Sequence, residues 1–321
     1  MDSRALTDRL ARAVEQDRVP GLHAVVVAHR GRVVLEHYGE GEDLRLNEPL
    51  GHVRFTPDTL HDVRSVTKGV VGLLYGIALA DGRVPEPREP LLRHFPEYPD
   101  LAEDPRRAAL TVEHALTMTL GLEWNEDAPY TSAANDEVAM ELAPDRCRYV
   151  LERPIVEEPG VRRSYCGGAT ALLARLVEKG TGSALADHAR DRLFEPLGIT
   201  RFEWVTGADD TALAAAGLRL TPRGLLAIGR LVLDGGRGIV PASWLATALR
   251  PHVRLDEDSC YGYHWYTGRG WAAASGNGGQ RIHVAPPLDL VVAVTAGQYD
   301  SPGRQTASAV LDEVILPAIE R

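Results

Sequence analysis

The stretch HDVRSVTKGVVGLL, residues 61–74, places Ser65 three residues before Lys68 at the start of an apolar segment. Apolar residues recur at helical spacing from there to Ala80, and Asp81-Gly82 follows as a stop signal. The pattern predicts a buried helix over residues 65–80. Because residues i and i+3 share one face of a helix, the Lys68 amine is expected to reach the Ser65 hydroxyl.

This pair has the residue types of a serine nucleophile and its base. A serine hydroxyl is a poor nucleophile at neutral pH and needs a base. Partial burial and the positive end of the helix dipole are expected to lower the pKa of Lys68, so that a neutral amine could take the serine proton. Unpaired backbone N–H groups at the helix start favour developing negative charge beside Ser65. The alternative is that Ser65 only caps the helix and Lys68 points to water; the apolar run around Lys68 favours the catalytic interpretation.

Composition limits the classes of protein that need to be considered. The 321 residues suffice for one large domain or two modest ones, and 44% apolar with 25% charged residues is ordinary for a globular protein. A net charge of -10 argues against nucleic acid and anionic membrane as partners. Cys147, Cys166 and Cys260 lie far apart without CxxC spacing, which indicates reduced thiols and no zinc site.

The N-terminal residues 1–21 carry acids and bases at helical spacing and no long apolar core, which indicates an amphipathic helix rather than a signal peptide. No run approaches the roughly 18 apolar residues of a membrane span. We therefore predict a soluble, cytoplasmic protein that needs no cofactor.

The remaining patterns predict an α/β (α+β) fold. Residues 22–38 form two β-branched runs around Arg30-Gly31, a hairpin signal; residues 39–59 are expected to be a polar loop and residues 83–110 irregular. Residues 260–297 indicate an antiparallel meander, and residues 304–320 a helix packed on a sheet. Helices are expected around 111–119, 135–142, 168–179, 183–193, 222–233 and 241–249. The simplest assembly is a central antiparallel sheet built from both chain ends and flanked by helices, with a mostly helical insert.

Two further segments carry possible site residues. Tyr165 precedes a Gly pair and a predicted helix, where a phenol could relay a proton to a leaving group; a core tyrosine is the alternative. Asn277 stands among three glycines between two predicted strands, at residues 276–279. Glycines allow close backbone approach to a ligand, and a free strand N–H can complete an oxyanion hole. An ordinary glycine-rich turn is the alternative there.

Taken in order, these segments resemble the serine β-lactamase and penicillin-recognising enzyme superfamily, in its branch of class C-like esterases and 6-aminohexanoate-dimer hydrolases. The resemblance covers nearly the whole chain: HDVRSVTK, ALTMTLGLEWNED (115–127), SYCGGATALLARLVEKGTG (164–182) and GNGGQRIHVAPPLDLVVAVTAG (276–297) each look like a family segment. It implies a β-lactamase-like fold with a sheet domain of residues 1–82 and 217–321, a helical domain of residues 83–216, and the active site between them.

The resemblance also implies roles. Ser65 would be the acylated nucleophile, Lys68 the general base and Tyr165 the second acid/base. The oxyanion hole would be the N–H of Ser65 plus that of Asn277 or Gly278. Trp124, Tyr130, Trp271 and Gly279 are expected to contact substrate, although each aromatic could equally be a core residue.

Two departures from the family pattern bear on the substrate. The Tyr-x-Asn pattern is Tyr165-Cys166-Gly167 here, so the Asn side chain is missing. The Lys-Thr-Gly triad that serves a substrate carboxylate has no counterpart, since Ser275-Gly276-Asn277 stands near its place. Both point away from a true β-lactamase and toward a serine hydrolase acting through an acyl-enzyme on small esters or amides.

Other functions remain open on the same fold: an acyltransferase, a true β-lactamase or D-Ala-D-Ala peptidase, and a non-catalytic acyl-binding protein. An α/β-hydrolase is disfavoured because no G-x-S-x-G motif occurs, and a metal hydrolase because no H-E-x-x-H motif occurs. His61 is expected to support the site rather than act as base. The sequence does not specify the oligomeric state.

Overall fold

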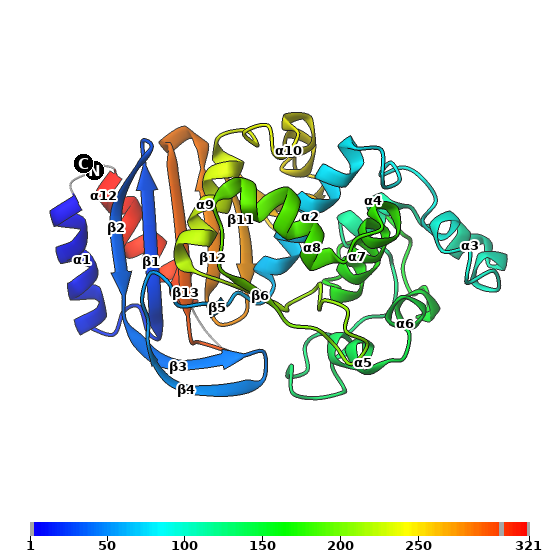
Figure 1. Ribbon diagram of the computed structural model, residues 1–321, viewed down its shortest axis with the longest axis horizontal. Coiled ribbons are helices and arrows are strands. Elements are labelled where there is room, and N and C mark those ends of the chain that lie inside the picture. The colour runs from blue at the N-terminus through cyan, green and yellow to red at the C-terminus, as the bar shows by residue number, and fades with distance from the viewer. Residues whose placement is uncertain (1–2, 302–304, 320–321) are drawn as a thin grey trace.

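A central antiparallel sheet organises the chain, described here in a computed structural model for residues 3–301 and 305–319 (Figure 1). In this part of the chain the sheet has eight strands, in the order β2-β1-β13-β12-β11-β10-β9-β8. Their bounds are β1 Leu22–His29, β2 Arg32–Tyr38, β8 Val253–Arg254, β9 Ser259–Tyr261, β10 Tyr266–Gly268, β11 Trp271–Gly276, β12 Gln280–Ala285 and β13 Leu290–Ala296. The first hairpin and the last strands therefore build one sheet from both ends of the chain.

The middle of the sheet is apolar on both faces because helices cover both. Every residue of β1 and β13 is buried, and the two strands pair antiparallel with Val25 opposite Val294. Val26 belongs to the core shared with α2 (Val66–Ala80) and α9 (Pro222–Leu233), while Val27 belongs to the core under α1 (Ser3–Glu15). Because successive side chains of a strand point to opposite faces of the sheet, β1 contributes to a hydrophobic layer on each side.

The face of the sheet that α1 covers is also covered by the C-terminal segment. This segment consists of α11 (Thr306–Ala309), a π-helical turn η6 (Val310–Ile315) and α12 (Leu316–Ile319). Figure 1 shows α1 and α12 at the sheet end of the molecule, close to both termini.

Helix α2 lies against the sheet and is buried from Val66 to Ala78. Its glycines let large rings approach the backbone: the indole N–H of Trp265 donates to Gly69 O at 3.2 Å, and that of Trp244 to Gly72 O at 3.0 Å. A helix this apolar all round belongs in a protein core. Lys68 therefore lies in a place where an ammonium group needs partners.

The helices of the middle of the chain gather beyond α2, at the end of the molecule away from the termini (Figure 1). Helix α7 packs on α2, and α4, α6 and α8 pack on α7. The bounds are α3 Pro105–Ala108, α4 Val112–Leu116, α5 Asp136–Leu142, α6 Arg146–Glu152, α7 Gly167–Thr181 and α8 Leu185–Ala189, which a π-helical turn η3 (Arg190–Phe194) extends; short 3-10 turns include η1 Leu91–His94, η2 Leu101–Glu103, η4 Glu195–Leu197 and η5 Pro286–Leu288. Helix α10 (Ala242–Ala248) lies beside α2.

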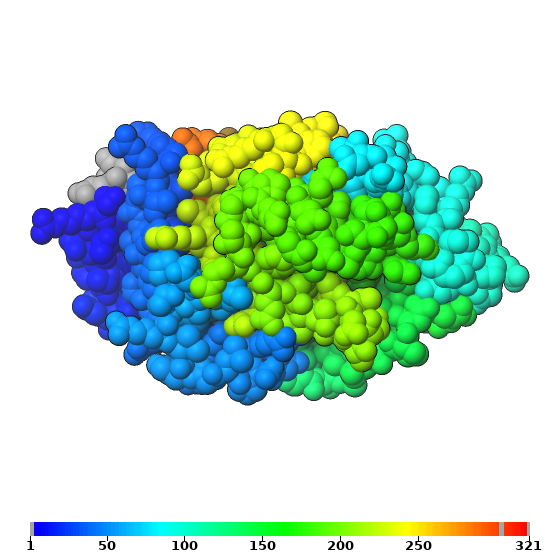
Figure 2. Space-filling model, viewed as in Figure 1, coloured from blue at the N-terminus to red at the C-terminus, as the bar shows by residue number. Residues whose placement is uncertain are grey.

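The predicted polar loop at 39–59 is wrong, because this segment forms a second hairpin, β3 (Glu40–Arg45) and β4 (Glu48–Arg54). Its outward-facing residues are polar, so the sequence does not show the apolar alternation that predicts a strand. Figure 2 shows this blue segment against the yellow-green segment near residue 205, where Arg45 pairs with Glu203 at 2.6 Å. A small sheet, β5 (His61–Asp62), β7 (Leu218–Leu220) and β6 (Phe202–Trp204), continues from that contact to the start of α2.

Most other predicted elements are confirmed, and the fold class is the predicted one. The 22–38 hairpin, the 65–80 helix and the 222–233 helix match β1–β2, α2 and α9. Helix α6 was not predicted, and β9 and β10 are separated by Gly262–Trp265. The predicted tail helix is broken by its π turn, and its residues 304 and 320 lie outside the described residues.

The division into two domains stays a prediction; one hydrophobic core, with Leu74 of α2 and Leu173 of α7 among its members, runs through both parts. Cys147, Cys166 and Cys260 are free thiols. Among the helices of residues 3–301 and 305–319, none is both long and apolar enough to span a membrane.

Candidate active site

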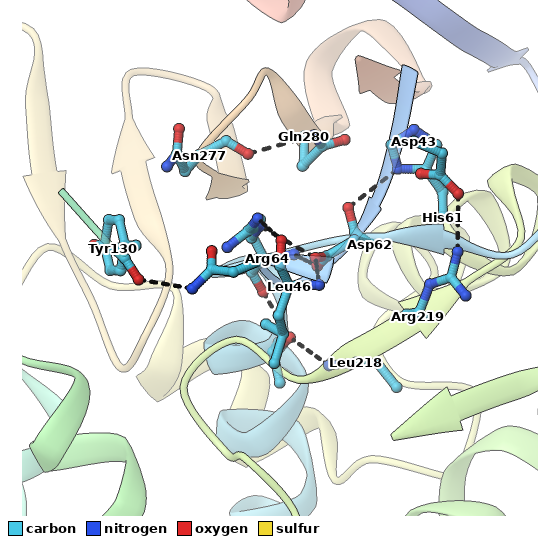
Figure 3. Close-up of polar contacts among 12 residues, drawn as sticks. Asp43, Leu46, His61, Asp62, Arg64, Tyr130, Leu218, Arg219, Asn277 and Gln280 are labelled. Carbon is cyan, nitrogen blue, oxygen red and sulfur yellow. Dashed lines mark hydrogen bonds and ion pairs between the residues drawn. The ribbon is translucent and has the colours of Figure 1, made fainter. Parts of the chain in front are cut away.

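Ser65 stands at the N-cap position of α2 but does not cap the helix with its side chain. Its hydroxyl is therefore available for chemistry, which disfavours the capping interpretation. The preceding residue, Arg64, has φ +46°, a left-handed conformation that is strained for a residue with a side chain. Asp62 holds it there by accepting the Arg64 backbone N–H at 3.0 Å and pairing with its guanidinium at 3.1 Å (Figure 3).

Lys68 reaches Ser65 as the sequence predicts. Its Nζ donates to Ser65 Oγ at 3.0 Å, to Glu137 Oε2 at 3.0 Å and to Ala215 O at 2.9 Å. An ammonium has three N–H donors, and these three acceptors use all of them. The side chain does not point to water, because Lys68 is only 1% exposed.

The predicted lowering of the Lys68 pKa is wrong in direction. Burial alone would lower it, but the Glu137 carboxylate, with Tyr165 and Glu126 adding to it, raises the pKa of Lys68 well above its ordinary value. The resting site therefore holds a lysine cation paired with a carboxylate.

Glu137 is the functional candidate that the sequence analysis missed. It lies in the first turn of α5, and the buried Asn135 caps that helix by accepting the backbone N–H of Glu137 at 3.0 Å. The Asn135 amide also donates to Ala128 O at 2.7 Å, which ties the preceding loop to the cap. Only the Asn-Asp-Glu helix start could have drawn attention to it, and such a start is common on protein surfaces.

A second buried carboxylate lies nearby. Glu126 accepts the phenol of Tyr130 at 2.9 Å, the indole N–H of Trp124 at 2.6 Å and the backbone N–H of Gly167 at 2.5 Å. Burial and the charge of Glu137 raise the pKa of Glu126 to about 7. Trp124 thus supports Glu126 and packs against the core, whereas Tyr130 faces the cavity at Ser65.

Tyr165 lies beside the pair, with its ring face toward Lys68 Nζ at 4.9 Å from the ring centroid. Arg163 lies 5.0 Å from the same centroid. Burial raises the pKa of the Tyr165 phenol, against the opposing effect of the Lys68 cation. A phenol with a raised pKa is a proton donor rather than a phenolate base at neutral pH.

The end of β11 approaches Ser65 through Gly276. An added Cβ at Gly276 would lie 2.5 Å from Val63 O and 3.0 Å from Ser65 N, so only glycine fits this approach. Asn277 follows, and its side chain is turned to Asp300, whose backbone N–H it accepts at 3.0 Å. Gly278 has φ +90° and accepts the Gln298 N–H at 3.0 Å.

A cavity of about 280 Å³ opens at Ser65. Its lining includes Tyr130, Tyr165, Tyr266, Ser275, Gly276, Asn277, Gly279, Gln280, Arg281 and Gln305. A larger cleft of about 720 Å³ lies elsewhere, against α6 and α7, and does not include the serine. The cavity at Ser65 is the smaller of these two, but it is the one that the Ser65–Lys68 pair adjoins.

The cavity does not include every predicted contact. Neither Trp124 nor Trp271 is among its lining residues; Trp271 starts β11, roughly 17 Å from the Gly276 end at about 3.3 Å per residue, and stacks on His283. Arg281 lines the cavity, and its buried Nε has no hydrogen-bond partner within the described residues. His61 is buried, and its ring nitrogens contact His23 Nδ1 at 2.7 Å and Asp62 O at 3.1 Å rather than Ser65.

The arrangement suits acyl transfer. A hydroxyl and an amine lie at hydrogen-bond distance, a phenol lies alongside, and the backbone of a strand end meets a helix start where an oxyanion would form. In residues 3–301 and 305–319 no group of His, Cys, Asp and Glu side chains is arranged to hold a metal ion.

Comparisons with known proteins agree with this geometry. The sequence model of the beta-lactamase family matches residues 6–314. The 6-aminohexanoate-dimer hydrolase of Paenarthrobacter ureafaciens is 26% identical over 298 residues, which cover 84% of this chain and 71% of that protein. The D-aminopeptidase of Brucella anthropi is 32% identical over 191 residues, or 59% of this chain, which spans only 33% of that longer protein.

Among solved structures, EstCE1, a hydrolase with promiscuous acyltransferase activity, is similar with a TM-score of 0.78 at 15% identity, over 99% of both chains. At this identity the likeness shows the fold alone.

Proposed function

This chain belongs to the beta-lactamase family, and from that premise we propose that it is a serine hydrolase that cleaves small esters or amides through an acyl-enzyme. The observation that carries the proposal is the Ser65 hydroxyl, which caps nothing and lies 3.0 Å from Lys68 Nζ. Such a hydroxyl becomes an activated nucleophile when Lys68 is in its neutral form and can accept the proton.

In the proposed first step, Ser65 Oγ attacks the substrate carbonyl carbon while its proton passes to the neutral form of Lys68. The oxyanion is held by the Ser65 N–H and a second N–H from the turn after β11. Asn277 is favoured as that second donor, because it directly follows Gly276, which approaches Ser65 N; Gly278 is the alternative.

In the second half, the tetrahedral adduct collapses and the leaving group takes a proton from the Tyr165 phenol, which Lys68 then reprotonates. Water attacks the acyl-enzyme by the same route in reverse, and Ser65 regains its proton. Tyr130 and Gly279 line the cavity, which supports a role for both in contacting the acyl group.

An acyltransferase is the second candidate, since the second step is the same with an alcohol or amine in place of water. The full-length structural likeness to EstCE1 supports keeping it. Adding an alcohol to an ester assay distinguishes the two, because a transferase forms the exchanged ester at the expense of the free acid. Burst kinetics with a chromogenic ester would expose a protein that is acylated but turns over slowly or not at all.

Replacement of Ser65 by alanine is expected to abolish nearly all ester hydrolysis while the protein stays folded. A fluorophosphonate should add its mass at Ser65, as peptide mass spectrometry can check. Ser183→Ala, which replaces a partly buried serine outside the cavity, is the control and should keep wild-type activity. Labelling of a different serine would refute the assignment.

Lys68→Arg retains the charge but removes a group that can give up its proton at working pH. We expect kcat for a nitrophenyl ester to fall on the order of 10²-fold or more, as for loss of a general base. Lys179→Arg, on the surface of α7 and paired with Glu97, is the matched control. A near-wild-type kcat in Lys68→Arg would mean that the lysine acts only through its charge.

Tyr165→Phe keeps the ring and removes the proton donor. An amide nitrogen must be protonated to leave, whereas a nitrophenolate leaves unaided, so amide or alkyl-ester turnover should fall further than nitrophenyl-ester turnover. Tyr38→Phe, in β2 on the sheet, provides the control. Equal losses on both substrates would assign Tyr165 a packing role only.

Uncharged esters are expected to be better substrates than β-lactams because the Lys of the family triad is missing. A carboxylate without a charged partner loses roughly 1.5–3 kcal/mol, or about ten- to a hundredfold in affinity. We expect kcat/KM for nitrophenyl butyrate to exceed that for nitrocefin.

An equal or higher value for nitrocefin would restore a β-lactamase. Arg281, which lines the cavity, would then be the cation responsible, and Arg281→Ala should remove that activity, whereas Arg269→Ala, which replaces an exposed arginine in the turn between β10 and β11, should not.

A further inference from the structure

Gly167 marks the point where the Tyr-x-Asn pattern of the family is broken. It is the first residue of α7, two residues after Tyr165, and it offers no side chain toward Lys68. A Cβ added there would collide with Glu137 Oε2 and lie 2.9 Å from Glu137 Cδ. The Glu137 carboxylate therefore fills the space that a side chain at position 167 would occupy.

That carboxylate makes a specific contact. Glu137 Oε2 lies 3.0 Å from Lys68 Nζ, and both side chains are buried, with 7% and 2% of their side-chain surface exposed. The other two acceptors of Lys68 are Ser65 Oγ and Ala215 O, so Glu137 is the one charged group bonded to this ammonium within the described residues.

The position of Glu137 is fixed independently of Lys68. Its helix start is capped by Asn135, and the neighbouring Asp136 accepts the Asn125 N–H at 2.7 Å and the Tyr149 phenol at 2.8 Å. Glu137 is thus delivered to Lys68 by a rigid helix start, as a residue that holds another in place must be.

We propose that Glu137 is a positioning residue that takes over the place of the missing Asn side chain, holding Lys68 against Ser65 and setting the pH at which Lys68 becomes a base. This inference rests on the proposed acyl-enzyme function and adds a residue outside its Ser-Lys-Tyr set. Unlike an amide, a carboxylate also supplies charge, and that difference can be measured.

The charge predicts a pH dependence. Glu137 raises the pKa of Lys68, and the active base is the neutral amine, so ester hydrolysis should rise with pH through the alkaline range. Without the Glu137 carboxylate, burial is the main influence on the pKa of Lys68, and burial lowers it. The rising limb of the pH–activity profile should therefore move to lower pH. The other titratable groups facing the pair are Glu126, Tyr130, Glu141, Tyr165, Tyr261 and His264.

The decisive variant is Glu137→Gln, which keeps the size of the side chain. We expect its rising limb of kcat/KM for a nitrophenyl ester to lie about one to three pH units below that of the wild type, the usual effect of removing one adjacent opposite charge. Glu141→Gln is the matched control, since it removes a partly buried carboxylate of the same helix that pairs directly with Arg146 and acts on Lys68 without bonding to it. An unshifted limb in Glu137→Gln, or an equal shift in Glu141→Gln, overturns the proposal.

A second pair of variants tests whether the Glu137 carboxylate and a side chain at position 167 compete for the same space. Gly167→Ala should push the Glu137 carboxylate off Lys68 and reduce kcat/KM, by up to about 10²-fold for a misplacement near 1 Å. Glu137→Ala/Gly167→Asn restores the family pattern and should recover at least about tenfold over Glu137→Ala, a coupling expected only of residues in contact. Additive losses would contradict the proposal even where Glu137→Gln fails to fold.

Fluorophosphonate labelling distinguishes this inference from the function on which it rests. If Ser65 is labelled and Lys68→Arg is inactive, but the Glu137 and Gly167 variants behave as simple stability mutants, only the role of Glu137 fails. If Ser65 is not labelled in the wild type, the acyl-enzyme function itself fails.

Discussion

The buried Lys68 ammonium is the constraint on which the rest of the site depends. An unpaired charge in a protein interior is several kcal/mol unfavourable, so three acceptors must converge on one nitrogen. They come from three separate parts of the chain: Ser65 before α2, Glu137 in α5 and Ala215 before β7. Because these three acceptors must all reach Lys68, α5 and the segment before β7 are held against the start of α2, where Ser65 lies.

The same requirement ties stability to catalysis. Removing one partner of a buried ion pair typically destabilises a protein by about 3–5 kcal/mol, because the remaining charge stays buried. Helix α2 cannot relieve this by turning, since Gly69 and Gly72 hold it against Trp265 and Trp244. Lys68 is therefore kept in the one orientation in which its amine reaches the serine.

The sequence pattern predicted the features that depend on residues close together in the chain. The Ser65–Lys68 contact follows from i,i+3 geometry, and β1, β2 and α2 follow from their apolar patterns. Contacts between distant segments could not be predicted in this way: Glu137 lies 69 residues from Lys68, and nothing in its own helix distinguishes it from a surface acid. The family resemblance drew attention to Ser65, Lys68 and Tyr165, which the structure brings together, whereas the contact between Glu137 and the space beside Gly167 could be found only from the structure.

The pKa of Lys68 is shifted in the direction opposite to the prediction, and the relative sizes of the competing effects explain why. A helix dipole contributes about 0.3–1 kcal/mol at an exposed terminus, and it lowers a lysine pKa near the N-terminal end. A carboxylate about 4 Å away contributes roughly 4 kcal/mol at an effective dielectric constant near 20, and it raises the pKa. The Lys68–Glu137 distance of 3.0 Å is shorter still, so the pair overrides both the dipole and burial. The pKa of Lys68 is thus governed less by the helix that carries it than by the residue that faces it from α5.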